Sequence, residues 1–480
     1  MDFDNLQKCV AQLIFSHFSH PPTQGQQIAC QTLIQFLYDT DSSSTALLRG
    51  YAGTGKTTLV SAIIQTAPQL NLKTILMAPT GRAAKVLSNY SGKTAYTIHK
   101  KIYTSSTDNN GRIKTVRAPN KHSHTLFIID EASMIDNTPL YYPGQKSLLL
   151  DLIDYVRSGN QCRMLLIGDT AQLPPVGTEQ SDALDADYLT AEGNLKIFET
   201  ELTEVVRQEL ASGILANATH LRRQITNIWD TAPIQLPLFQ INGHNDILRL
   251  TGEDLEETLH REYDEHGEED VVVICRSNKR ANLYNEAIRN RVLYRDNEIG
   301  AGDLLMVVKN NYYWSEETSG IGFIANGDIA EVLSVRGEQE LYGHRFADAS
   351  LRFIDYPDAP TLECKLLLTT LHSEGASLTD AENQQLFNAV MEDYADLPTK
   401  ADRMRAIKKD PYYNTLQVKF AYALTCHKTQ GGQWNTVIVE QGYITEDQMN
   451  KSYLRWLYTA ITRATQRVYL LNFQEHFFEQ

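Results

Sequence analysis

Short apolar runs alternate with helical patterns along the chain. Four predicted strands fall in the first 200 residues: Thr45–Arg49, Thr74–Ala78, Thr125–Asp130 and Arg163–Gly168. Each is largely apolar and ends in or near Gly, Pro or Asp, which is typical of buried parallel strands. A second set follows later, at Asp270–Arg276, Thr436–Glu440 and Arg467–Asn472. The pattern predicts an α/β protein with two parallel sheets, one in residues 1–200 and one in the remainder.

A different pattern occupies residues 335–418. Strand-like pieces at Ala349–Ile354 and Leu362–Thr370 precede helical patterns at Leu378–Asp396 and Ala401–Lys408, and Pro411 stops the last of these. We expect an inserted β-rich subdomain here. The second α/β domain then consists of residues 201–334 and 419–480.

A smaller insertion lies at residues 100–123. The β-branched stretches Lys101–Thr107 and Arg112–Arg117 flank Asn110-Gly111. Asn-Gly between two strand-like runs is a strong hairpin signal, because both residues tolerate positive φ. The sequence therefore predicts a hairpin, either a functional element or a surface decoration.

Composition limits the class of protein. With 480 residues and 42% apolar residues, the chain is not mainly disordered. No apolar run approaches the roughly 18 residues of a membrane span, and the N-terminus does not read as a signal peptide. Six cysteines form no C-x-x-C pair, which argues against a zinc site or disulfide framework and favours a reducing, cytoplasmic compartment.

The net charge of −15 is unevenly distributed. Residues 253–270 contain ten acidic side chains and Arg261 as their one Lys or Arg. Such a run is typical of a solvated helix face and loop. Because binding depends on a local basic groove, the total charge does not exclude a nucleic-acid partner.

A phosphate-binding motif follows the first predicted strand. Residues 50–57, GYAGTGKT, fit G-x-x-x-x-G-K-T and open a helical run. Backbone N–H groups of such a loop wrap phosphates, the lysine reaches the β and γ oxygens, and the threonine offers a hydroxyl to Mg²⁺. The predicted ATP-binding residues are Gly53, Thr54, Gly55, Lys56, Thr57 and Thr58.

An apolar strand delivers Asp130 and Glu131 to the carboxyl edge of the same predicted sheet. We expect Asp130 to bind Mg²⁺ together with Thr57. Glu131 is placed to orient and deprotonate the attacking water. Beside a complete phosphate loop, this pair predicts a nucleoside triphosphate hydrolase.

The remaining motifs resemble the superfamily 1 helicases, in the branch with RecD-like, Dda-like and Pif-family enzymes. They are APTGRAAK (78–85), TIH (97–99), GDTAQLPPVG (168–177), LTEVVRQ (202–208), YALTCHKTQG (422–431) and LYTAITRA (457–464). Their order and spacing extend the resemblance from about residue 20 to about residue 472. It implies two RecA-like domains with ATP between them, DNA as substrate and movement in the 5′ to 3′ direction.

The resemblance also implies roles in the ATP site. Gln26 matches the residue that reads adenine, although a glutamine in a Gln-rich turn is more often simply solvated. Gln172 matches the γ-phosphate sensor. Arg207 and Arg463 match arginines that reach the γ-phosphate across the cleft, where a guanidinium neutralises charge that spreads in the transition state. A surface ion pair is the alternative for each arginine.

Seven residues match family positions that contact single-stranded DNA: Pro79, Thr80, Thr97, His99, Thr425, His427 and Lys428. Hydroxyl and backbone N–H groups after strand ends suit phosphates. His427 is equally well interpreted as a structural histidine.

Two features depart from the family pattern. Many relatives have Glu where this chain has Gln433, so a hydrogen bond to ribose would survive without the charge. Residues 335–418 match no family string. Relatives have an SH3-like subdomain at this point, but a minimal SH3-like subdomain does not contain a helix as long as the one predicted at 378–396.

The sequence therefore predicts an ATP-dependent DNA helicase that translocates on single-stranded DNA and unwinds duplex, with the 100–123 hairpin as a separating pin. An RNA-directed helicase and the motor subunit of a nuclease complex are alternatives within the class. A P-loop ATPase that remodels protein should lack the second motor half, and a degenerate binding module should lack Lys56, Asp130, Glu131 and Arg463.

Overall fold

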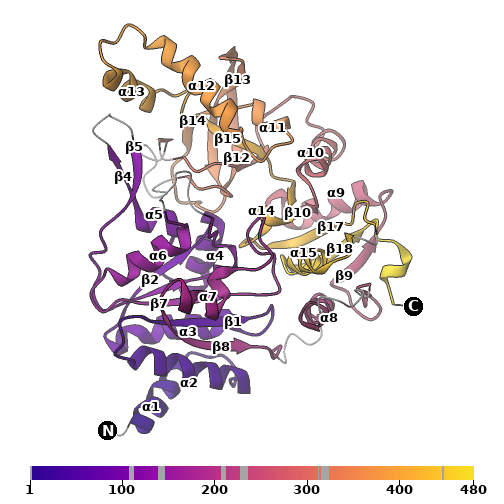
Figure 1. Cartoon of the computed structure of the whole chain (residues 1–480). Coiled ribbons are helices and arrows are strands. Elements are labelled where there is room, and N and C mark those ends of the chain that lie inside the picture. Colours follow the sequence, from indigo (N-terminus) through magenta and orange to yellow (C-terminus); the bar gives the residue numbers. More distant parts are fainter. Residues whose placement is uncertain are drawn as a thin grey trace.

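The computed structural model describes residues 3–107, 113–138, 146–206, 212–227, 236–311, 313–314, 324–445 and 448–479 (Figure 1). The structure has three parts: two parallel sheets and a closed β-barrel. In Figure 1 the first sheet lies at the lower left, the second at the right and the barrel at the top. This confirms the predicted α/β class with a β-rich insertion in the second half.

The sheet of the first domain has the strand order β3-β2-β6-β7-β1-β8, and all its pairings are parallel. Its strands are β1 (Ser44–Gly50), β2 (Lys73–Ala78), β3 (Ala95–Thr97), β6 (Thr125–Ile129), β7 (Arg163–Gly168) and β8 (Lys196–Leu202). The domain boundary expected at residue 200 falls inside β8, which pairs with β1 along its whole length.

Helices cover both faces of this sheet. One face packs against α1 (Phe3–Phe15), α2 (Gln24–Tyr38), α3 (Lys56–Thr66) and α4 (Gly81–Ser91); the other packs against α5 (Ile98–Ile102), α6 (Leu148–Arg157) and α7 (Ala186–Ala191). Ala46 and Leu48 point into the first core and Leu47 into the second. Successive side chains of a strand alternate between faces, so burial on both sides explains the continuous apolar runs.

The sheet of the second domain has the order β16-β10-β17-β18-β9 and is also parallel. Its strands are β9 (Ile247–Leu250), β10 (Val271–Cys275), β16 (Ala423–Thr425), β17 (Trp434–Glu440) and β18 (Ala464–Leu471). Its helices include α8 (Gly213–Asn227), α9 (Leu255–His266), α10 (Asn278–Ala287), α14 (Cys426–Thr429) and α15 (Lys451–Ile461). Most of the acidic stretch is α9, whose inner residues Leu259 and Glu262 are buried.

The inserted subdomain is a closed five-stranded barrel that extends beyond residues 335–418 on both sides. Its strands are β11 (Leu304–Val307), β12 (Ile329–Leu341), β13 (His344–Phe353), β14 (Leu362–Leu367) and β15 (Leu416–Phe420). Pairing of Leu305 with Phe420 closes the barrel, so a strand before residue 335 is required. In sequence, β11 resembles any other short buried strand. Only its pairing with β12 and β15 shows that it belongs to the barrel rather than to the second sheet.

Three helices accompany the barrel: α11 (Thr369–His372), α12 (Asp380–Asp393) and α13 (Lys400–Lys408). The predicted helix at 378–396 is shorter in the structure. It begins with a capping box in which Thr379 and Glu382 satisfy each other's backbone N–H groups.

The two strands of the predicted hairpin are present as β4 (Tyr103–Thr107) and β5 (Ile113–Arg117). They pair antiparallel from Tyr103 with Arg117 to Thr107 with Ile113. The Asn110-Gly111 turn lies outside the described residues. At the base, Arg117 contacts Asp154 on α6 at 2.6 Å. In Figure 1 the hairpin extends from the first domain in the direction of the barrel and α13.

Among the helices in the described ranges, none combines the length and the apolar character that crossing a membrane requires.

Candidate functional site

The phosphate loop connects β1 to α3, which begins at Lys56. Gly53 and Gly55 have φ of 71° and 77°, in the left-handed region that favours glycine. A Cβ on Gly55 would lie 2.3 Å from Nε2 of Gln26. The second glycine therefore allows both the backbone conformation and the close approach of the loop to α2.

A cavity of about 620 Å³ opens in front of this loop, between the two α/β domains. Gly53, Gly55, Lys56, Thr57 and Thr58 line it. The Lys56 ammonium donates to the carbonyl oxygens of Gly50 at 2.6 Å and Tyr51 at 2.8 Å. These bonds hold the side chain against the loop, from which it can turn to a phosphate.

Two of the predicted ATP-binding residues do not line this cavity. Thr54 is fully buried and its hydroxyl donates to the carbonyl of Tyr51 at 2.8 Å. Gln26 accepts from the backbone N–H of Thr23 at 2.9 Å as part of the capping box of α2, and its Nε2 donates to the carbonyl of Thr54 at 3.5 Å. The amide thus links α2 to the loop, and its role in reading adenine stays a prediction.

Asp130 and Glu131 follow β6 at the carboxyl edge of the sheet and line the same cavity as Lys56 and Thr57. The Asp130 carboxylate accepts from the hydroxyl of Tyr90 at 2.7 Å and from the backbone N–H of Glu131 at 2.8 Å. Glu131 has φ of 51°, which costs a non-glycine residue about 1–3 kcal/mol. The bond from its own N–H to the Asp130 carboxylate helps to hold this backbone conformation.

Arg463 reaches this site from the second domain. It follows α15 and is 5% exposed, and its Nη1 lies 3.9 Å from Oε1 of Glu131. Burial raises the pKa of Glu131, and the Arg463 charge partly opposes that shift. A carboxyl with a raised pKa is a better proton acceptor, which suits a general base.

A hydrogen-bond network joins the two domains behind the cavity. The buried Tyr458 hydroxyl on α15 accepts from the N–H of Ala52 in the phosphate loop at 2.9 Å and donates to Asp169 at 2.6 Å. Burial raises the pKa of Tyr458, so the phenol stays protonated as a donor. One residue further on, Thr459 accepts from the N–H of Leu173 at 2.9 Å.

Gln172 lies on the wall of the nucleotide cavity, and its role as a γ-phosphate sensor stays a prediction. It is 7% exposed and lines the cavity, and its Oε1 has no hydrogen-bond partner. The structure therefore brings together Lys56, Thr57, Asp130, Glu131, Gln172 and Arg463. The predicted second arginine, Arg207, lies outside the described residues.

Sequence reasoning missed Tyr458, Thr459 and Tyr90. A signal for Tyr458 and Thr459 existed, because both place hydroxyl groups within a mostly apolar helix, and buried polar groups need partners. A further contact between the domains was also missed: the Arg82 guanidinium stacks 3.8 Å from the Trp434 ring and donates to the carbonyl of Gln433 at 3.1 Å. Gln433, the departure from the family pattern, lines the cavity.

The predicted DNA contacts lie at or just after the carboxyl ends of strands, β2 and β3 in the first sheet and β16 in the second. Ala78 pairs with Thr97, so Pro79, Thr80 and Thr97 share one edge of the first sheet. Thr425 ends β16, the edge strand of the second sheet. The Thr80 and Thr97 hydroxyls also cap α4 and α5, which gives each a local structural role.

Three of these residues carry lowered pKa values. Burial lowers the pKa of His99 and of His427, and burial together with the Lys419 charge lowers the pKa of Lys428 to about 8. Burial also lowers the pKa of Lys419 to about 8. Lys419 on β15 therefore joins Lys428 as a partly desolvated cation.

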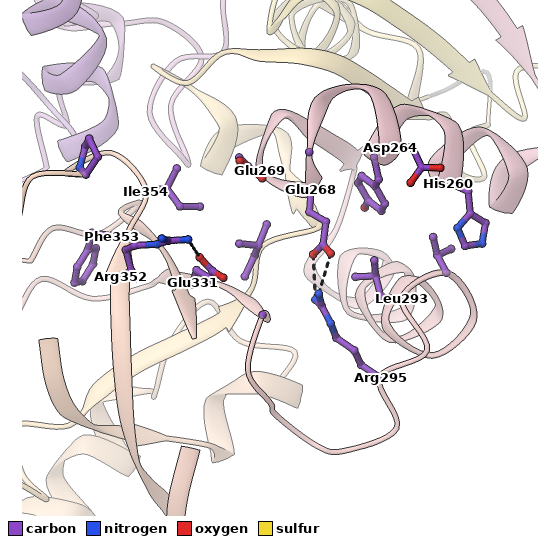
Figure 2. A pocket seen from close by; sticks show the side chains of 16 residues that line it. His260, Asp264, Glu268, Glu269, Leu293, Arg295, Glu331, Arg352, Phe353 and Ile354 are labelled. Carbon is purple, nitrogen blue, oxygen red and sulfur yellow. Dashed lines mark hydrogen bonds and ion pairs between the residues drawn. The ribbon is translucent and has the colours of Figure 1, made fainter. Parts of the chain in front are cut away.

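Another cavity, of about 770 Å³, lies apart from this site, between α9 and the barrel (Figure 2). Its charged side chains largely pair with one another: Glu268 with Arg295 at 2.8 Å, and Glu331 with Arg352 (Figure 2). No residue of the phosphate loop lines it. It shows no chemistry that would serve nucleotide hydrolysis.

Comparison with known proteins agrees with this arrangement. Residues 23–228 match the AAA domain family, and residues 420–471 match the UvrD-like helicase C-terminal domain family. The chain is 27% identical over 432 residues to the ATP-dependent RecD2 DNA helicase of Deinococcus radiodurans, covering 88% of this chain and 46% of that protein. It is 27% identical over 295 residues to the ATP-dependent DNA helicase dda of Enterobacteria phage T4, covering 59% and 60%.

The chain thus spans roughly half the length of these curated relatives. Among solved structures, Pif1 helicase from Bacteroides in complex with ADP-AlF3 and ssDNA aligns with a TM-score of 0.47 and 13% identity, covering 96% of this chain and 95% of that one.

Two parallel sheets, a phosphate loop and an arginine that reaches it from the second domain define a P-loop protein of the two-domain, RecA-like class. Within that class, the family models and curated relatives confirm the resemblance to the superfamily 1B helicases that the motifs predicted.

Proposed function

We propose that this protein is an ATP-dependent DNA helicase that translocates on single-stranded DNA in the 5′ to 3′ direction and unwinds duplex. The observation that carries the proposal is the position of Arg463. This second-domain residue lies 3.9 Å from Glu131 in the cavity that Lys56 lines. Hydrolysis in such a cavity depends on closure of the two domains, which is what a motor requires.

The chain's own residues supply the chemistry of hydrolysis. Lys56 leaves its two carbonyl partners to bind the β and γ oxygens of ATP. Glu131 accepts the proton of the attacking water as that oxygen bonds to the γ-phosphorus and the bond to ADP breaks. Arg463 neutralises the charge that spreads over the phosphoryl oxygens, an effect worth about 10³–10⁵ in rate in related enzymes.

Thr57 and Asp130 fit a magnesium site. Both line the cavity and both offer hard oxygen ligands, which Mg²⁺ prefers. Bound there with ATP, the ion would partly neutralise the phosphate charge. Tyr90 orients the carboxylate by donating to Asp130.

DNA would follow the carboxyl ends of the strands in both domains, past Thr80 and Thr97 in the first and Thr425 and Lys428 in the second. Closure and opening of the cleft would then move one set of contacts relative to the other. The relatives named as DNA helicases support DNA as the substrate. The hairpin β4–β5 would meet the duplex ahead of the moving protein.

The deciding experiment measures ATP turnover with no nucleic acid, with single-stranded DNA and with RNA of the same sequence, using Lys56→Ala as the inactive control. We expect DNA to stimulate turnover more than RNA does. Unwinding of 5′-tailed and 3′-tailed duplexes then gives the direction. Stimulation by RNA alone would show that RNA, not DNA, is the substrate. The absence of stimulation by either nucleic acid would overturn the helicase assignment.

A further inference from the structure

One segment of the first domain carries an excess of positive charge. Residues 93–124 contain seven Lys and Arg residues and Asp108 as their one acidic residue, whereas the whole chain has a net charge of −15. The segment comprises the edge strand β3, helix α5 and the hairpin strands β4 and β5. A local surplus of cations in an acidic protein indicates a surface for an anionic partner.

Several side chains of this segment lie close to one another and to the start of β2. The ammonium groups of Lys100 and Lys101 on α5 lie 5.6 and 5.0 Å from the centre of the Tyr96 ring on β3. Burial, the Lys101 charge and the charge of Lys73, which begins β2, lower the pKa of His122. Both ammonium groups therefore lie near the His122 ring, and the cations extend from β3 to β2.

Two further lysines adjoin this group. The Lys93 ammonium donates to the hydroxyl of Thr74, the residue after Lys73, at 3.1 Å, and Lys121 precedes His122. Lys73 and Lys121 are exposed, and the other members are half-buried. The surface that these residues form is called the lysine edge, and it consists of Lys73, Lys93, Tyr96, Lys101 and Lys121.

Neighbouring carboxylates do not neutralise the lysine edge. In the described part of the chain, Lys73, Lys101 and Lys121 form no ion pair. The carboxylates that α6 presents beside the hairpin already pair with Arg117 and Lys146. The positive charge of the lysine edge is therefore available to a partner.

The lysine edge leads away from the predicted DNA contacts. Tyr96 immediately precedes Thr97, the predicted contact at the carboxyl end of β3, whereas Lys73 lies at the amino end of β2. At about 3.3 Å per residue, the six residues of β2 place its ends about 17 Å apart. Nucleic acid on the lysine edge would therefore leave the path that joins the carboxyl ends of the two sheets.

We propose that the lysine edge binds the DNA strand that is displaced when the protein unwinds duplex. The inference rests on the proposed function, since a displaced strand exists only at a junction that the protein opens. Lysine ammonium groups contact backbone phosphates as point charges and need no particular sequence. The hairpin starts directly after α5, so a strand that the hairpin deflects meets this surface (Figure 1).

Tyr96 is the reason to assign a single strand rather than duplex. Its ring lies between two cations and is partly exposed. An aromatic ring beside phosphate-binding cations offers a platform on which an unpaired base can stack, whereas the bases of a duplex are already stacked on one another.

The test combines Lys73→Gln, Lys101→Gln and Lys121→Gln in one protein, the lysine-edge variant. The control protein combines Lys8→Gln, Lys196→Gln and Lys451→Gln, so that the net charge changes equally. These three control lysines are exposed, and Lys196 begins β8, the opposite edge strand of the same sheet. None of the six lysines lines the nucleotide cavity, so both proteins should hydrolyse ATP on single-stranded DNA at the parent's rate.

Affinity is measured by fluorescence anisotropy for a single strand, for duplexes with one 5′ or one 3′ tail, and for a fork with both tails. We expect the parent and the control to bind the fork at least tenfold more tightly than either tailed duplex. Three additional phosphate contacts should make the salt dependence of fork binding steeper by about 2. The lysine-edge variant should lose both differences, and Tyr96→Leu should lose part of the tenfold gain.

Equal binding of the fork and the tailed duplexes by the parent would overturn the inference, as would equal fork binding by the lysine-edge variant and the control. A loss that already appears with the single strand or the tailed duplexes would also overturn it, because the lysine edge would then hold the tracking strand or the duplex. If no DNA stimulates ATP turnover but the fork preference depends on the lysine edge, the proposed function fails and the binding surface remains. Stimulated turnover without a fork preference refutes the lysine edge alone.

Discussion

Glu131 is held in a strained backbone conformation at the point where a base would be needed. Replacing it with Gln keeps the shape and the hydrogen-bonding capacity but removes the proton acceptor. We expect Glu131→Gln to bind the ATP analogue and DNA normally while single-turnover hydrolysis falls about 10²–10⁴-fold, the usual contribution of a general base. Glu192→Gln, at an exposed position after α7, is the control.

The pH dependence of the parent provides a second check on the same residue. Only the deprotonated carboxylate accepts a proton, and burial raises its pKa above the ordinary 4.5. The rate should therefore rise with pH through a pKa higher than 4.5. A Glu131→Gln variant that turns over at nearly the parent rate would show that another group is the base.

Tyr458 couples the phosphate loop to the second domain through a single hydroxyl. Tyr458→Phe leaves the N–H of Ala52 and the Asp169 carboxylate without this partner, and each such loss costs about 1–3 kcal/mol. We expect lower stability in urea and a reduced DNA-stimulated rate, because the closed cleft loses a fixed contact with the loop.

The matched control lies on the same helix. Tyr453 is buried, and its hydroxyl lies near the Gln441 amide of the same domain rather than at the phosphate loop, so Tyr453→Phe removes no hydrogen bond between the domains. We expect this variant to retain the parent's stability and rate. Equal effects of the two substitutions would mean that α15 tolerates neither change and that the Tyr458 network has no specific role.

At the scale of single elements, the hairpin β4–β5 is the part whose role depends least on the nucleotide site. It follows the predicted DNA contact His99, and none of the described residues of its two strands lines the nucleotide cavity. If it is a pin, replacing residues 104–114 with a short Gly-Ser turn should spare DNA-stimulated ATP turnover and translocation on single strands. Duplex unwinding should drop sharply, because the moving protein no longer meets a wedge. It can be measured with a fluorescent forked duplex.

Full unwinding by this shortened protein would identify the hairpin as a surface decoration. Strand separation would then occur elsewhere, and the barrel with α12 and α13 is the next candidate. An effect on turnover without DNA would instead indicate that the deletion disturbs the first domain, where Arg117 anchors the hairpin to Asp154.

At the scale of the whole molecule, DNA binding should be sensitive to pH despite the net charge of −15. Burial lowers the pKa of both Lys419 and Lys428 to about 8, so each loses its charge as the pH rises through that value. We expect the affinity for single-stranded DNA to fall between pH 7 and pH 9 at constant ionic strength. The measurement is fluorescence anisotropy of a labelled oligonucleotide.

Lys428→Arg separates this cause from a general effect of pH, because a guanidinium stays protonated throughout the range. The variant should show a smaller decrease. Affinity should also decrease with salt, with a slope of about −0.7 per neutralised phosphate. A pH-independent affinity in the parent would place these lysines away from the DNA.

The sequence by itself determined the features that depend on local spacing. The phosphate loop, the strand that delivers Asp130 and Glu131, and the main buried strands of both sheets were predicted because each is a short pattern with its own physical requirement. The apolar strands are visible because burial on both faces leaves no polar positions. The resemblance to the helicase motifs also predicted Arg463 as a residue of the ATP site, although Glu131, which it approaches, lies in the other domain.

Only the tertiary structure decided which distant segments meet. The barrel needs β11, and nothing in that strand's sequence distinguishes it from a strand of the second sheet. The Tyr458 network combines residues hundreds of positions apart, so its polar atoms find partners only once the domains pack. Spacing along the chain sets what a segment can form, whereas burial and hydrogen bonding between segments set what its side chains can do.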